Sequence, residues 1–197
     1  NKLLTENLRF NLGTIRFESG DNLGVEVSRG FEFLNEDFDI LGDSTVIVAP
    51  GKYVNWGYEL QASSASFRKV SGSIGYEAGG FWTGNIRRLV MGLTIRPALG
   101  INLSSGYTHA QVSAENSGFS TNLFQVDLGL DFTPDISLSS NIQFDDISDI
   151  LGTNTRFRWI ITPGTDIFFV YNHNWLNNPT LNRRLFTTQQ GAAMKAV

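Results

Sequence analysis

Apolar and polar residues alternate along this chain in one segment after another, most of them about 9–12 residues long. In one such segment Phe124, Val126 and Leu128 share one face of an extended strand, whereas Gln125 and Asp127 share the other. A helix would not sort these residues in this way, because its side chains repeat every 3.6 residues instead of every two. The alternation therefore predicts an all-β protein whose antiparallel strands each have one apolar and one polar face.

Turn-forming residues divide the alternating segments from one another. The pattern predicts about eleven strands, at residues 3–17, 22–33, 53–63, 69–78, 86–96, 100–111, 120–133, 136–147, 154–162, 166–174 and 186–197. Strands of this length match the thickness of a bilayer that is crossed obliquely. We therefore expect the C-terminal portion of a transmembrane antiparallel up-and-down β-barrel.

The connections between the predicted strands are expected to alternate in length. Short turns contain pairs such as Pro97-Ala98 and Pro134-Asp135, and longer loops are expected at 34–52, 79–85, 112–119, 148–153 and 175–185. Outer-membrane barrels have short periplasmic turns and longer exterior loops, and bacterial ones have an even number of strands. The C-terminus is thus expected to point to the periplasm, and residues 1–197 to form one barrel segment with an odd number of further strands upstream.

The strands of a soluble β-sandwich also alternate between apolar and polar residues. Composition and strand length are therefore needed to distinguish a sandwich from a membrane barrel. Charged residues make up 17% of the chain, below the roughly 25% of soluble domains. The strands are longer than the usual 5–6 residues, and aromatic residues gather at their ends, as in interfacial girdles. We expect a porin-like integral protein of the outer membrane of a Gram-negative bacterium, acting as a pore or as a membrane scaffold. The alternative is a soluble all-β carbohydrate-binding module.

Several functions lack support in the sequence. A net charge of −4 offers no broad basic surface for nucleic acid. Without cysteine there is no thiolate metal site, and His109 and His173, interpreted as surface or girdle histidines, have no partner at a metal-ligand spacing. No serine-hydrolase elbow, phosphate loop or zinc-protease motif is present. We expect no enzyme activity, no catalytic residue, no cofactor and no metal.

The candidate functional residues are polar or charged side chains on the expected lumen side of the strands. Counting back through a loop at 148–153 places Asp145 opposite Arg156 and Gln143 opposite Arg158. Such pairs either line a solute-selective wall or only stabilise the hairpin. The full set of predicted lumen-lining residues is Arg156, Arg158, Asp145, Gln143, Asp127, Asp131, Arg96 and Glu59.

Short stretches between about Val46 and Trp175 resemble a known family. They are Ala-Pro-Gly-Lys-Tyr at 49–53, Val-Ser-Gly-Ser-Ile at 70–74, Gly-Gly-Phe-Trp-Thr-Gly at 79–84, Asn-Thr-Arg-Phe-Arg-Trp at 154–159, and the stretch at 163–172 from Pro163 to Asn172. Their order and spacing are similar to those in the C-terminal barrel of a poorly characterised bacterial outer-membrane family. Members of this family usually carry an N-terminal family-nine-like carbohydrate-binding domain.

The resemblance implies a barrel in the outer membrane, and it supplies no catalytic residues to carry over. It implies contact with outer-membrane lipid, and with other envelope proteins or saccharides through an N-terminal domain that this sequence does not contain. The family usually continues beyond the position of Val197 into an aromatic-rich terminal strand. That strand, which carries the assembly signal, is therefore expected to lie outside this sequence.

Overall fold

The computed structural model describes residues 4–42, 45–114, 117–178 and 184–196. These residues form strands connected by turns. The strands are β1 (Thr5–Arg16), β2 (Asn22–Leu34), β3 (Phe38–Asp39), β4 (Ile47–Val48), β5 (Gly51–Ser63), β6 (Val70–Phe81), β7 (Gly84–Ile95), β8 (Ile101–Ser113), β9 (Gly118–Thr133), β10 (Ile136–Asp145), β11 (Ile150–Thr162), β12 (Thr165–Asn178) and β13 (Arg184–Ala196). No helix of the described residues is long and apolar enough to cross a membrane.

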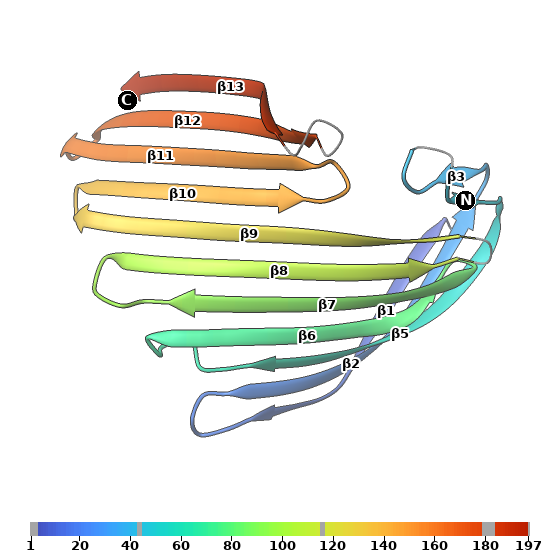
Figure 1. Ribbon diagram of the computed structural model, residues 1–197. Helices are drawn as coiled ribbons and strands as arrows, with labels where there is room; N and C mark the ends of the chain where they lie inside the picture. Colours follow the sequence, from blue (N-terminus) through green and yellow to red (C-terminus); the bar gives the residue numbers. More distant parts are fainter. Residues whose placement is uncertain (1–3, 43–44, 115–116, 179–183, 197) are drawn as a thin grey trace. The chain divides into compact units, whose positions relative to one another are not determined.

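Eleven of these strands form one sheet in the order β1-β2-β5-β6-β7-β8-β9-β10-β11-β12-β13. Neighbours in this order are also neighbours along the chain, apart from the excursion with β3 and β4 between β2 and β5. The registered pairs are antiparallel, and Figure 1 shows β10, β11, β12 and β13 lying side by side in chain order. The predicted all-β class and each of the eleven predicted strands are thus confirmed. The short β3–β4 pair was not predicted.

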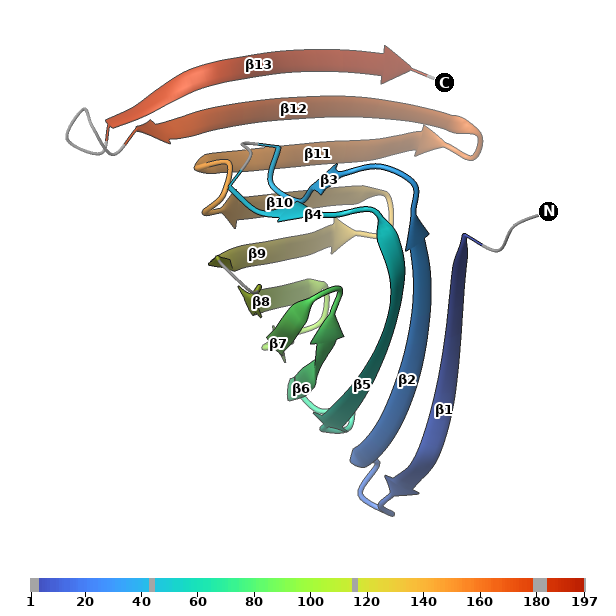
Figure 2. The same ribbon diagram turned by 90° about the vertical axis from the view of Figure 1, so that its right-hand side faces the viewer.

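The chain divides into two compact units. The first contains residues 1–65, 73–91 and 108–121, and the second contains 66–72, 92–107 and 122–197. Figure 2 shows the first three long strands of the first unit, β1, β2 and β5, running side by side.

The prediction of long loops at 79–85, 112–119 and 148–153 is wrong. Trp82 and Thr83 alone join β6 to β7, and the described strands reach further into the other two connections than alternation indicated. Of the loop predicted at 175–185, residues 175–178 and 184–185 belong to β12 and β13, and residues 179–183 lie outside the described part. Among the described residues, the connection predicted at 34–52 is the one that remains long. The predicted direction of the chain across a membrane was based on an alternation of short turns and long loops. Most of that difference in length is absent from the described connections, so this support for the direction is largely removed.

The apolar face of the strands is the exposed one. On β5, Val54, Trp56, Tyr58 and Leu60 are each between 49% and 56% exposed, whereas the intervening Glu59 is less exposed. Phe124 on β9 and Phe169 on β12 are 49% and 45% exposed. A water-soluble sheet would cover such a face with a second layer, since large exposed apolar patches are rare in soluble monomers.

Buried apolar side chains gather in the first unit. Among the described residues the buried hydrophobic side chains are Val46, Val48, Ala65, Ala78, Ile86, Ala110 and Val112. The β3–β4 excursion meets the β6–β7 turn, where the rings of Phe38 and Trp82 lie 5.4 Å apart. The indole nitrogen of Trp82 donates to Glu32 at 2.9 Å, which fixes the turn to β2. The long connection thus packs against neighbouring strands of its own unit.

Candidate functional site

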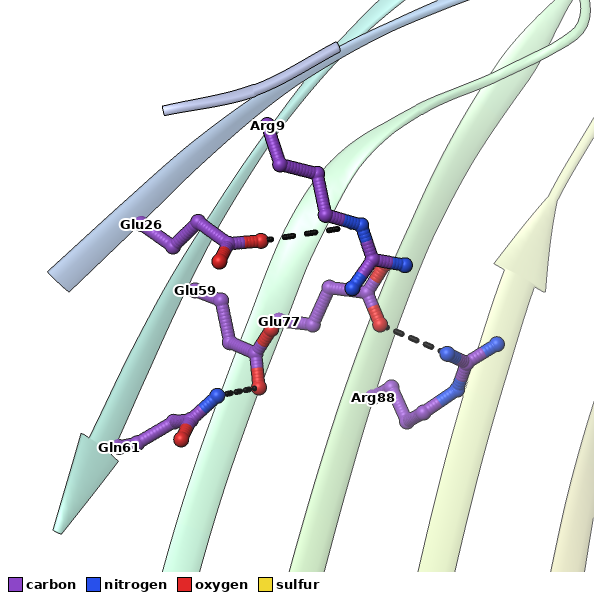
Figure 3. A network of polar contacts seen from close by, with 6 residues as sticks. All are labelled: Arg9, Glu26, Glu59, Gln61, Glu77 and Arg88. Atoms are coloured by element: carbon purple, nitrogen blue, oxygen red, sulfur yellow. Dashed lines mark hydrogen bonds and ion pairs between the residues drawn. The ribbon is translucent and has the colours of Figure 1, made fainter. Parts of the chain in front are cut away.

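A row of charged side chains crosses five neighbouring strands on the polar face of the first unit (Figure 3). Glu26 on β2 lies directly opposite Glu59 on β5, and Glu59 lies directly opposite Glu77 on β6. Arg9 on β1 and Arg88 on β7 flank these three carboxylates. The side chains share one face because directly opposed residues in an antiparallel pair point the same way. We call these five residues the charged row.

The two arginines pair with the outer carboxylates of the charged row. The Nη1 of Arg88 lies 2.7 Å from Oε2 of Glu77, and the Nε of Arg9 lies 3.9 Å from Oε1 of Glu26. The central Glu59 accepts a hydrogen bond of 2.6 Å from the Gln61 amide, and no cation pairs with it among the described residues. The row thus places an unneutralised carboxylate between two ion pairs.

The charged row borders an open groove with a volume of about 250 Å³. Asn7, Ser28 and Val90 also line this groove. A second groove of about 420 Å³ is lined by Glu26, Glu59 and Gln61 together with small residues such as Gly75 and Ser73. Both grooves are open, and Glu26 and Glu59 line both of them, so each is suited to contact with water and hydrated cations.

The polar face of the second unit is held by amide and carboxylate contacts. Asp127 accepts hydrogen bonds from Gln125 at 2.9 Å and from Asn141 at 2.7 Å. Further along the same face, Asn154 donates to Asn172 on the neighbouring strand. The side chains are thus polar and bonded to one another across strands β9 to β12.

The predicted hairpin register between β10 and β11 is wrong. Arg156 lies opposite Ser139 and Arg158 lies opposite Ser137, whereas Asp145 faces Ile150 and Gln143 faces Gly152. The reason is the connection, which is shorter than expected because β11 begins at Ile150.

Asp145 explains why the turn is short. Its carboxylate accepts the backbone N–H of Ile147 at 2.9 Å and the hydroxyl of Ser148 at 3.0 Å. Asp149 completes the turn at a φ of 53°, in the left-handed region that aspartate tolerates better than most residues. Asp145 therefore accepts hydrogen bonds within the turn, and it is not opposite Arg156 or Arg158 in the strand register.

Arg156 and Arg158 find their partners on β12. Both Nε and Nη2 of Arg158 donate to one carboxylate oxygen of Asp166, at 3.0 and 2.6 Å. The guanidinium carbons of Arg156 and Arg158 lie 5.4 and 5.7 Å from the centre of the Phe168 ring, within the range of cation–π attraction. The two arginines thus form a cluster with Asp166 and Phe168.

The remaining predicted residues lie at strand ends or in grooves. Gln143 lines a groove of about 460 Å³ with Asn154 and Asn172. Asp131 pairs in register with Ser137 near the end of β9. Arg96 follows the last residue of β7, and its Nη1 donates to the carbonyl oxygen of Ser66 at 2.8 Å. Arg96 therefore braces the turn between β5 and β6.

His173 is buried, with 7% of its surface exposed, which differs from the surface or girdle histidine that the sequence predicts. Its two ring nitrogens lie 2.6 Å from the Tyr171 hydroxyl and 2.9 Å from that of Thr187, and its ring stacks on Trp175. Both nitrogens are used, so His173 has a structural role here. No group of three or more potential metal ligands occurs among the described residues.

Periodicity identified Glu59 as a candidate but missed the rest of the charged row. Glu77 and Arg88 already alternate onto polar faces in the sequence, and Glu26 stands between Val25 and Val27. What the sequence lacks is the register that aligns them, since β2 and β5 are separated by the excursion containing β3 and β4. Comparison with protein-family models, curated protein sequences and solved structures finds no significant match for this chain.

Proposed function

We propose that this chain belongs to an integral β-barrel of the bacterial outer membrane, with its polar face towards a water-filled lumen and its apolar face towards lipid. The observation that carries the proposal is the exposure of the apolar face, for example at Trp56 and Leu60, which are 56% and 49% exposed. In a bilayer this face would contact acyl chains, so its exposure would cost little. The family resemblance at 154–172 points the same way.

The polar face supports a pore in particular. Its carboxylates, amides and arginines face open grooves in each unit and bond mostly to one another, as in the charged row and around Asp127. Rings of charged side chains set the ion preference of many pores. Because Glu59 has no cationic partner among the described residues, the charged row favours cations over anions.

Conductance in a planar bilayer tests the proposal. The protein purified in detergent is expected to give steady currents with a preference for cations. Replacing Glu59 with glutamine removes one negative charge and is expected to shift the reversal potential in a salt gradient towards anions. The matched control is Glu18→Gln, which changes the same charge outside the strands.

Two other outcomes would contradict the pore. A protein that inserts into the bilayer but carries no current would favour a membrane scaffold, with the packed β3–β4 pair as the feature to examine. A protein that remains in the aqueous fraction without detergent would favour the soluble carbohydrate-binding module instead.

A further inference from the structure

The apolar face of the first unit carries a groove that is unlike the rest of that face. It has a volume of about 460 Å³, and its lining includes Trp56, Tyr58, Arg87 and the amides Asn85 and Gln111. Trp56 and Tyr58 are 56% and 55% exposed. The groove therefore combines exposed aromatic rings with a guanidinium group and two amide groups that can donate hydrogen bonds.

Arg87 has no acidic partner among the residues that the structure describes. It lies on β7 next to Arg88, whose side chain alternates onto the opposite face and pairs with Glu77. Within the described part of the chain no hydrogen bond or ion pair engages the Arg87 side chain, and the residue is exposed. Arg29, which lies opposite Trp56 on the same apolar face, is instead paired with Glu6 at 3.4 Å. An exposed guanidinium on an apolar face without such a partner is available to a ligand that supplies the negative charge.

The position of Arg87 along β7 suits the headgroup region of a bilayer. Arg87 is three residues after Gly84, the first residue of β7, which corresponds to roughly 10 Å at the usual rise along a strand. The cost of an arginine on a lipid-facing strand falls from about 2–4 kcal/mol at the midplane to about 0–1 kcal/mol near the interface. Tryptophan and tyrosine also concentrate at this depth.

We infer that this groove binds the phosphate headgroup of a membrane lipid. Arg87 would grip two phosphate oxygens with its planar guanidinium, and Asn85 and Gln111 would donate further hydrogen bonds to the same group. Trp56 and Tyr58 would cover the glycerol or sugar backbone of the lipid and direct its chains along Leu60. The ligand is an amphiphile with an anionic phosphate, and the inference rests on the proposed membrane location.

Native mass spectrometry of the protein, released from detergent with added lipid, tests the inference. Phosphatidic acid is expected to stay bound, and phosphatidylcholine is expected to bind at least tenfold more weakly because its phosphate is already paired with a cation. Arg87→Gln should weaken phosphatidic acid binding by roughly tenfold or more, as expected for a lost charged hydrogen bond. Arg87→Lys should recover part of the affinity, which separates lost charge from misfolding.

Arg16→Gln is the control, since it removes the same charge from the last residue of β1, outside the lining of this groove and outside the charged row. Equal retention of phosphatidic acid by wild type and Arg87→Gln, or equal loss in Arg87→Gln and Arg16→Gln, would overturn the inference. Competition by inorganic phosphate as strong as that of the lipid would also overturn it, because it would indicate a site for a free anion.

The proposed membrane location is tested separately, by measuring whether the same protein floats with liposomes in a density gradient. If the protein floats but Arg87→Gln binds lipid normally, only the lipid site fails. If it does not float and a phosphate-free oligosaccharide binds in a Trp56-dependent way, the membrane proposal and the lipid site fail together.

Discussion

Glu59 and Glu77 face each other directly across β5 and β6, with Glu26 in register on the other side of Glu59. Like charges in directly opposed positions destabilise a strand pair. The flanking pairs of Glu77 with Arg88 and of Glu26 with Arg9 offset part of this repulsion. A sheet under selection for stability alone would not keep three aligned carboxylates, which is why we connect the charged row with the solvent of a lumen.

Removing the central carboxylate should stabilise the sheet. Glu59→Gln relieves two like-charge contacts, so the free energy of unfolding is expected to rise by roughly 0.2–1 kcal/mol. Arg88→Gln should lower it by a similar amount, because Glu77 loses its partner at 2.7 Å. Urea unfolding in detergent measures both changes. If Glu59→Gln destabilises the protein, the glutamine–glutamate contact of Gln61 matters more than the repulsion.

The two faces of the strands should respond oppositely to a new charge. Leu93 on the apolar face is 43% exposed, and Leu93→Arg is expected to cost about 2–4 kcal/mol if that position lies near the bilayer midplane. Leu128→Arg, on the apolar face of β9, should behave in the same way. Heat-modifiable migration of the folded protein on gels reports the loss of membrane assembly.

Gln125 provides the control for these two substitutions. It lies on the polar face and donates to Asp127 at 2.9 Å, so an arginine at this position would have an acidic neighbour and water. Gln125→Arg should assemble normally. Equal tolerance at Leu93 and Gln125 would contradict the assignment of the faces.

The observed β10–β11 register predicts that Arg158 couples energetically to Asp166 and that Arg156 does not couple to Asp145. A double-mutant cycle of Arg158→Gln and Asp166→Asn should give a coupling of about 0.5–1 kcal/mol, since the two side chains are 2.6 Å apart and partly exposed. The same cycle for Arg156 and Asp145 should give about zero, within roughly 0.3 kcal/mol. A sizeable coupling in the second cycle would restore the register expected from the sequence.

Close strand packing makes Gly79 intolerant of a side chain. A Cβ there would lie 2.5 Å from the Trp56 carbonyl oxygen and 2.6 Å from the Gly57 Cα, both backbone atoms that cannot turn aside. Gly79→Ala is expected to lower the free energy of unfolding by about 1–3 kcal/mol. Gly13→Ala is the control, because its Cβ would meet nothing within 4 Å and should change stability by less than about 0.5 kcal/mol.

The strands could be predicted from the sequence because alternation is a local property. Each strand repeats every two residues whatever its neighbours are, so the eleven spans needed no knowledge of pairing. Register is different, since it depends on turn geometry. The bonds from Asp145 to Ile147 and Ser148 shorten the β10–β11 turn and move Arg156 and Arg158 away from their expected partners.

The candidate site depends on pairing between strands that the sequence separates. Glu26 and Glu59 are aligned only because the β3–β4 excursion returns the chain to β2 in one particular register. The excursion itself has strands of two residues each, too short for a periodic signal. The groove around Arg87 could not be predicted for a related reason. Its lining combines Arg87 with residues of β5 and β8, and the sequence does not show that these strands lie close to Arg87.

In the proposed membrane location, lipid covers the apolar face of the strands and water covers the polar face, and the accessibility of single cysteines distinguishes the two environments. The chain has no cysteine of its own, so single cysteines can replace Leu60 and its neighbour Gln61, both exposed in the structure. The protein is reconstituted in liposomes and treated with a water-soluble maleimide. We expect Gln61→Cys to react and Leu60→Cys to be protected until the lipid is dissolved; equal reaction at both positions in intact liposomes would contradict the assignment of the two faces.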